Sequence, residues 1–220
     1  MAAEVVSVER DGVEAAREAL ERCVGAGGVA LFPSDGLYGL ACDPLDASAI
    51  ARVHRIKGRD EGKPSAVMYF DRLAMRDVIA DLGPATRAAV AALLPGPVTL
   101  VVANPMHRYP LACRTEPDRL GVRLIRGPLA GTRTPIFQTS ANPSGQPAPA
   151  RFACVDARIV DAVDVAIDGG ELSGMPSTVV DLSCLDARGG WTVLREGALG
   201  AGELERRLAA IAEEPSADGG

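Results

Sequence analysis

Short apolar runs, bounded by glycine, proline or charged residues, recur along this 220-residue chain. Their length of about four to six residues and their wealth of valine, isoleucine and leucine are typical of strands buried in a sheet. The pattern predicts strands at 5–8, 29–32, 65–69, 98–102, 121–125, 136–139, 163–167, 177–182 and 192–194.

Between these runs, apolar residues recur at helical spacing. The segment 46–57 is the clearest case, because Asp46 suits a helix N-cap, Ile50 and Val53 fall on one face, and Gly58 favours a left-handed end. Further helices are predicted at 11–24, 73–79, 85–94 and 202–211. Strands that alternate with helices predict an α/β fold, with a mixed sheet covered by helices.

The composition, with 47% hydrophobic and 24% charged residues, is that of a globular chain. It indicates one domain over residues 1–212, and the polar residues 213–220 predict a disordered tail. No apolar run is long enough to span a membrane and the first residues do not form a signal peptide, so we expect a cytoplasmic protein. Five cysteines without CxxC spacing indicate small core side chains in a reducing compartment, with neither a disulfide framework nor a zinc site.

Basic residues gather in two blocks, although the net charge of the chain is −6. Residues 52–63 have a net charge of +3 and residues 107–133 a net charge of +4. Such blocks in an acidic chain favour a local anion site, and the alternative is two solvated surface runs. Lys57 and Lys63, the only lysines, both lie in the first block. A compact ammonium approaches phosphate as a point charge, which arginine cannot imitate.

Polar loops follow several predicted elements. Residues 33–40 (PSDGLYGL) and 139–145 (TSANPSG) each follow a strand, and residues 56–59 (IKGR) end a helix. Hydroxyl and amide groups beside glycine suit phosphate oxygens and magnesium-bound water, although the same residue types are common in ordinary turns. Ligand sites of open α/β sheets lie at strand ends, so these loops are candidate site segments, and the basic side chains near them are expected to be accessible.

Common catalytic templates are absent from the sequence: it has no GxxxxGK[ST], GxGxxG, HExxH or GxSxG motif. With only His54 and His107, a histidine-centred metal site or a Ser/His/Asp triad is not expected. His54 lies on the predicted helix 46–57 and is interpreted as a structural residue.

The order of motifs resembles that of the YrdC/Sua5 family, the L-threonylcarbamoyladenylate synthases. The motifs are PSDGLYGL, KGR, LLPGPVTLV, GVRL, TSANPSG, DGG, PSTVVDL and LREGAL, and they span about residues 29–199. The resemblance implies the short, single-domain form, a twisted sheet with a concave basic cavity, and ATP as substrate with Mg²⁺. It implies that L-threonine, bicarbonate and ATP give threonylcarbamoyl-adenylate and pyrophosphate for the tRNA modification threonylcarbamoyladenosine. It also implies tRNA and the downstream threonylcarbamoyl-transfer proteins as partners.

The resemblance assigns roles by motif position. Those expected at the ATP phosphates and their magnesium ion are Lys57, Arg59, Ser140 and Asn142, with Lys63 and Arg195 as further nucleotide contacts. Those expected at the amino acid are Gly36, Met68, Arg123, which pairs with the carboxylate, and Ser177. No dedicated protein metal site is expected. Adenylate formation needs mainly positioning and charge neutralisation, which agrees with the missing triad.

The sequence departs from the family in the amino-acid pocket. The family usually has PTxTVYGL, and here Ser34 and Gly36 replace the two threonines, the second of which belongs to the pocket. Met68 replaces a histidine that contacts the amino acid. These changes predict weaker selection for the threonine hydroxyl, unless neighbouring groups or water replace the lost contacts. Two alternatives stay open: a YciO-like paralogue or carbamoyl-adenylate chemistry on another amino acid, and a non-catalytic RNA-binding protein.

Overall fold

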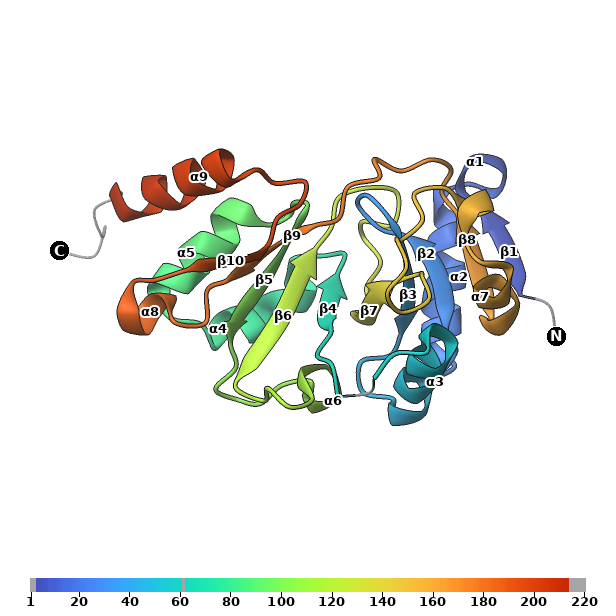
Figure 1. Ribbon diagram of the computed structural model, residues 1–220, viewed down its shortest axis with the longest axis horizontal. Coiled ribbons are helices and arrows are strands. Elements are labelled where there is room, and N and C mark those ends of the chain that lie inside the picture. Colours follow the sequence, from blue (N-terminus) through green and yellow to red (C-terminus); the bar gives the residue numbers. More distant parts are fainter. Residues whose placement is uncertain (1–2, 61, 214–220) are drawn as a thin grey trace.

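The computed structural model describes residues 3–60 and 62–213. Within them, one mixed sheet of ten strands has the order β1-β8-β2-β3-β7-β4-β6-β5-β9-β10. The strands are β1 Glu4–Ser7, β2 Ala30–Pro33, β3 Tyr38–Cys42, β4 Ala66–Tyr69, β5 Val98–Ala103, β6 Arg119–Leu124, β7 Ile136–Ser140, β8 Val165–Asp168, β9 Thr178–Asp181 and β10 Thr192–Arg195. Figure 1 shows the sheet twisting along the long axis, with β1 and β10 toward opposite ends. The predicted α/β class with a twisted mixed sheet is confirmed.

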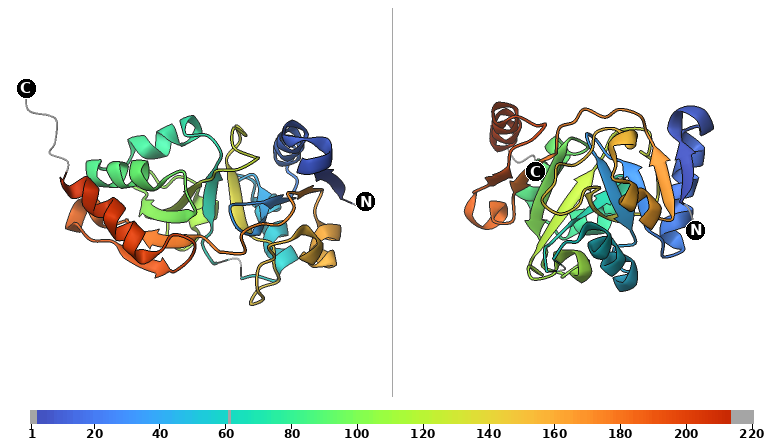
Figure 2. Two further views of the ribbon diagram at one scale, coloured as in Figure 1. Left: turned by 90° about the horizontal axis from the view of Figure 1, so that it is seen from above. Right: turned by 45° about the vertical axis from the view of Figure 1, so that its right-hand side comes forward.

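Helices cover the sheet mainly toward its two ends (Figures 1 and 2). The longer helices are α2 Val13–Gly25, α3 Ala47–Lys57, α5 Pro84–Leu93 and α9 Ala201–Glu213. The shorter ones are α1 Val8–Asp11, α4 Arg76–Ala80, α6 Pro110–Cys113, α7 Ala157–Ala162 and α8 Leu185–Arg188, with 3₁₀ turns at Leu73–Met75 and Phe152–Cys154. Helix α2 packs near β1 and β8, whereas α5 and α9 pack together at the other end.

Both faces of the sheet are buried, as the side chains of β2 demonstrate. Leu31 lies in the larger hydrophobic cluster with Ile50 of α3 and Val90 of α5. Its neighbour Phe32 lies in a second cluster with Leu20 of α2. Successive side chains of a strand point to opposite faces, so a strand covered on both faces needs a continuous apolar run. This explains why the predicted strands read as unbroken apolar segments.

The sequence pattern misplaced two backbone features. Residues 33–40 were expected to form a loop, but only Ser34 to Leu37 turn the chain, and Tyr38–Cys42 forms β3, antiparallel to β2. All five residues of β3 are buried, so its apolar side chains and ladder bonds override the turn residues before it. The helix expected at 11–24 is α2 and begins at Val13, because Gly12 with φ of +92° separates it from α1, a short helix that the pattern did not predict.

Expectations on the cysteines are confirmed in part. Cys23, Cys42 and Cys113 are buried, but Cys154 and Cys184 are exposed and do not fill the core. The disordered tail predicted for residues 213–220 lies outside the described residues, apart from Glu213 at the end of α9. Within the described chain, no helix is long and apolar enough to cross a membrane.

Helix α3 leads directly to the candidate site, and its bounds follow from its sequence. The Asp46 carboxylate accepts hydrogen bonds from the backbone N–H of Ser48 at 2.8 Å and of Ala49 at 3.0 Å. At the other end Gly58 is left-handed, with φ of +58°, so the chain turns away after Lys57. The predicted cap and stop are both confirmed.

Candidate functional site

Lys57 lies beneath the end of β7. Its Nζ donates to the backbone carbonyl of Ser140, to the carbonyl of Asn142 at 2.8 Å and to Asn142 Oδ1 at 3.2 Å. The residue is only 4% exposed, which contradicts the expectation of an accessible loop lysine. Lys57 is buried by tertiary contacts, because the loop after β7 folds over the end of α3 and supplies the hydrogen-bond acceptors. Burial, and next the charge of Arg59, lower the pKa of Lys57 to about 8.

Arg59 lies beside this ammonium and adds a second cation. Its Nη1 donates to Thr139 Oγ1 at 2.9 Å and its Nη2 to the carbonyl of Pro64 at 2.8 Å. Burial also lowers the pKa of this guanidinium. Lys63 is exposed in the following loop. Among the described residues, buried Lys57 and half-buried Arg59 hydrogen-bond neutral oxygens, so their charge stays available to an anionic ligand.

A second cluster forms around Arg123 of β6. Its Nη2 donates to Asp35 Oδ2 at 2.9 Å and its Nη1 to Gln138 Oε1 at 3.2 Å. Arg123 is 6% exposed, and its Nε has no hydrogen-bond partner among the described residues. Burial lowers the pKa of Arg123 and raises that of Asp35, although their mutual attraction opposes both changes. A buried guanidinium with an unused donor is suited to a carboxylate.

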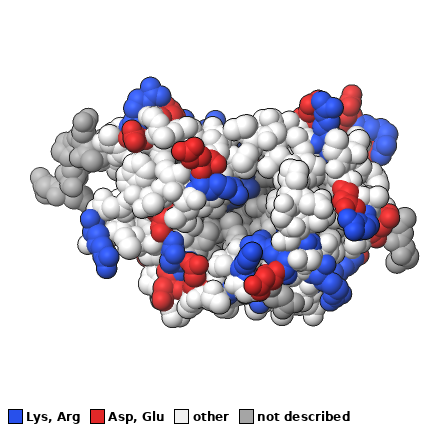
Figure 3. Space-filling view, in the orientation of Figure 1, with Lys and Arg blue, Asp and Glu red and all other residues white. Residues whose placement is uncertain are grey.

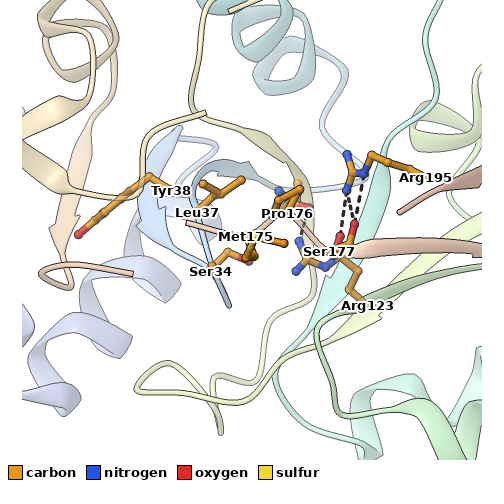
Figure 4. A pocket seen from close by; sticks show the side chains of 10 residues that line it. Ser34, Leu37, Tyr38, Arg123, Met175, Pro176, Ser177 and Arg195 are labelled. Carbon is orange, nitrogen blue, oxygen red and sulfur yellow. Dashed lines mark hydrogen bonds between the residues drawn. The ribbon is translucent and has the colours of Figure 1, made fainter. Parts of the chain in front are cut away.

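Arg195 and Ser177 complete this cluster from β10 and the start of β9. Arg195 Nη2 donates to the Ser177 carbonyl at 2.7 Å and to Ser177 Oγ at 3.1 Å, and Ser177 Oγ also bonds Thr99 Oγ1 at 2.9 Å. A cavity of about 60 Å³ lies between these residues (Figure 4). It is lined by Ser34, Gly36, Leu37, Tyr38, Arg123, Gln138, Met175, Pro176, Ser177 and Arg195.

Strand β7 joins the two clusters. Gln138 accepts from Arg123, Thr139 from Arg59 and Ser140 from Lys57, so three consecutive residues contact three cations. Figure 3 shows that this face of the molecule is hollowed near its middle, with basic side chains on both sides of the hollow. The expected basic cavity is therefore divided into a lysine–arginine cluster and an arginine-lined pocket.

The structure brings most of the predicted site residues together, with two exceptions. Lys63 is exposed in the loop after Arg59, and Met68 belongs to the core. Met68 is fully buried in the hydrophobic cluster that contains Phe32 and Ile136, and it does not line the cavity. Its position in β4 directs the side chain into the core. The predicted contact between Met68 and the amino acid is therefore wrong for this cavity.

Three residues of the cavity region were not predicted from the sequence. Asp35 and Gln138 lie within segments that were singled out, but nothing in the pattern pairs them with Arg123, 88 and 15 residues away. Met175 lies in a loop without a recognised motif. Within residues 3–60 and 62–213, no group of three or more His, Cys, Asp or Glu is placed to hold a metal ion.

Comparisons with known proteins find relatives of this chain. Residues 22–197 match the Sua5/YciO/YrdC family model, described as "Telomere recombination". A protein of Thiobacillus denitrificans named threonylcarbamoyl-AMP synthase is 33% identical over 179 residues, 77% of this chain and 93% of the relative.

Two solved structures are similar in fold. The crystal structure of P. abyssi Sua5 complexed with L-threonine superposes with a TM-score of 0.80 at 26% identity, over 94% of this chain and 61% of that chain. The structure of E. coli YciO has a TM-score of 0.73 at 23% identity, over 89% of this chain and 95% of that chain. With the match of residues 22–197 to the family model, these likenesses show that the chain belongs to the Sua5/YciO/YrdC family.

Proposed function

We propose that the protein is a nucleotidyltransferase that forms threonylcarbamoyl-adenylate and pyrophosphate from L-threonine, bicarbonate and ATP, for tRNA modification. The observation that carries the proposal is a pair of cations, buried Lys57 and half-buried Arg59, whose hydrogen bonds among the described residues go to neutral oxygens. They lie beside a pocket in which Arg123 Nε has no partner among those residues. The family relatives named threonylcarbamoyl-AMP synthase support the same reaction. We expect the protein to act in the cytoplasm, with tRNA and threonylcarbamoyl-transfer proteins as partners.

The phosphates of ATP are assigned to the lysine–arginine cluster. Lys57 and Arg59 there neutralise the charge that builds up on pyrophosphate as it leaves the α-phosphorus. Two side-chain oxygen atoms lie next to this ammonium: Ser140 Oγ at 3.4 Å and Asn142 Oδ1 at 3.2 Å from Lys57 Nζ. Such oxygens suit Mg²⁺, which when bound neutralises further phosphate charge. The two side chains would hold the metal together with the phosphates.

The amino acid is assigned to the second cluster. The α-carboxylate is assigned to Arg123, whose buried Nε has no hydrogen-bond partner among the described residues, and Ser177 lines the same cavity. The amino group, carboxylated by bicarbonate with release of water, gives a carbamate whose oxygen attacks the α-phosphorus. Arg195, which lines the same cavity from β10, is assigned to the nucleotide. The protein supplies orientation and charge, so no nucleophilic side chain is required.

The experiment that tests the proposal is pyrophosphate release by the purified protein with ATP, Mg²⁺, bicarbonate and L-threonine. We expect release that depends on both threonine and bicarbonate, and adenylate that contains both. Release with another amino acid but not threonine would favour a YciO-like paralogue with a different acceptor. ATP binding without release for any amino acid, together with tRNA binding, would favour the non-catalytic RNA-binding alternative.

The lowered pKa of Lys57 predicts the pH dependence of ATP binding. A lysine that titrates near pH 8 in the empty site is protonated at pH 7 and largely neutral at pH 9, and only the ammonium attracts phosphate. We therefore expect ATP affinity to fall about tenfold between pH 7 and pH 9. Calorimetric titration at several pH values measures this. The Lys57→Met variant should bind ATP more weakly at every pH, with an affinity that does not change between pH 7 and pH 9. An equally steep fall in the affinity of this variant would assign the pH dependence to another group.

A further inference from the structure

A neighbouring loop, residues 173–175, fills the space where a side chain at position 36 would lie. The backbone N–H of Gly174 donates to the Gly36 carbonyl at 2.9 Å. A Cβ atom at position 36 would lie 2.1 Å from the carbonyl oxygen of Met175 and 2.8 Å from Ser173 Oγ. Real Cβ atoms essentially never approach other atoms so closely, so the loop and a side chain at position 36 exclude one another. The loop that carries Met175 has taken the place of the side chain.

The same loop is held at both ends. At its start, Tyr38 Oη accepts from the backbone N–H of Gly169 at 3.0 Å and donates to the Gly170 carbonyl at 2.8 Å. At its end, the Ser177 carbonyl accepts two hydrogen bonds from Arg195. Tyr38 is fully buried in β3 and Arg195 belongs to the edge strand β10, so two strands of the sheet determine where the loop places Met175.

Met175 directs an apolar surface toward the cavity. It is 51% exposed although it is a large hydrophobic residue, and it lines the cavity together with Leu37 and Pro176. Figure 4 shows the three side chains on one side of the cavity, with Arg123 and Arg195 opposite. An amino acid whose carboxylate binds Arg123 in so small a space must place its side chain near this apolar wall.

We propose that Met175 is a specificity-determining residue and that the acceptor side chain is selected by apolar contact with Met175 and not by a hydrogen bond to its hydroxyl. The inference rests on the proposed function and narrows its substrate class to small amino acids with a branched or apolar side chain. An apolar pocket discriminates between isosteric side chains by about 100-fold at most, whereas a site that bonds a hydroxyl discriminates by about 10⁴ or more. Threonine and valine are isosteric, so their ratio distinguishes the two kinds of pocket.

The experiment measures kcat/KM for pyrophosphate release with threonine, valine, serine and leucine. In the wild-type protein we expect valine within about 100-fold of threonine. In the Met175→Ala variant, the added space should raise leucine relative to valine by about tenfold, because the removed group exceeds one methylene. The control is Met106→Ala, since Met106 is a methionine 64% exposed outside the cavity, and it should leave all ratios unchanged.

The proposed function and the role of Met175 are contradicted by different results. If the wild-type protein releases no pyrophosphate with any amino acid, the proposed function is wrong. Two other results would contradict the role of Met175 and leave the proposed function in place. One is pyrophosphate release with threonine and a preference for threonine over valine of about 10⁴ or more. The other is an unchanged ratio of leucine to valine in Met175→Ala. Calorimetric titration of the four amino acids in the presence of a non-hydrolysable ATP analogue should give the same order of ratios, and unchanged binding ratios in Met175→Ala would also contradict the inference.

Discussion

ATP affinity is expected to fall about 10- to 100-fold when Lys57 is replaced by methionine, because a charge-assisted contact with phosphate contributes about 1.5–3 kcal/mol. Methionine has nearly the length of lysine and keeps the contacts of its carbon chain. The charge is the main difference. Calorimetric titration with ATP and Mg²⁺ measures the change, and Arg55→Ala, an exposed arginine on the same helix, is the matched control that should bind as wild type does.

The fold of the variant has to be followed in the same experiment. Lys57→Met leaves the carbonyls of Ser140 and Asn142 without their ammonium partner, and it removes a buried positive charge. The first change destabilises the protein and the second stabilises it, so a small net change in melting temperature is expected. Circular dichroism gives the folded fraction. Wild-type affinity per folded molecule in Lys57→Met would contradict the assignment of this cluster to the phosphates.

Most of the fold is readable from the sequence because apolar runs of strand length report burial directly. The predicted strands are all present, shifted by up to about two residues at their ends. The strand Tyr38–Cys42 was missed because its residues follow Pro33 and Gly36, which usually mark a loop. The hairpin forms because all five residues of this strand pair and are buried between β2 and β7. Burial of a whole strand is a tertiary effect that local turn residues do not report.

The candidate site was readable only as a set of separate segments. Composition and motif order brought Lys57 and Asn142 to attention, but the burial of this lysine depends on carbonyls that lie more than 80 residues away in the sequence. The two methionines are instructive in the same way. Met68 was expected at the amino acid and belongs to the core, whereas Met175 lines the cavity and had no sequence signal. Which face a strand residue occupies, and where a long loop lies, depend on the assembled sheet.

Replacing Arg123 by glutamine is expected to abolish most amino-acid-dependent pyrophosphate release while ATP binding stays near the wild-type value. Arg123 is the buried cation assigned to the α-carboxylate, and removing a buried partner of a charged group costs about 3–5 kcal/mol. The expected loss in kcat/KM for threonine is therefore 100-fold or more. Pyrophosphate release and ATP titration measure the two properties on the same preparation.

The ion pair with Asp35 makes this variant ambiguous by itself, since Arg123→Gln also leaves a buried carboxylate without its partner at 2.9 Å. The double variant Asp35→Asn with Arg123→Gln removes both charges and should recover most of the lost melting temperature. If Arg123 binds substrate, the recovered fold remains inactive with threonine, because the cation assigned to the carboxylate is missing. If Arg123 only stabilises the sheet, activity returns together with the melting temperature. Stability without activity is the outcome that the free Nε of Arg123 leads us to expect.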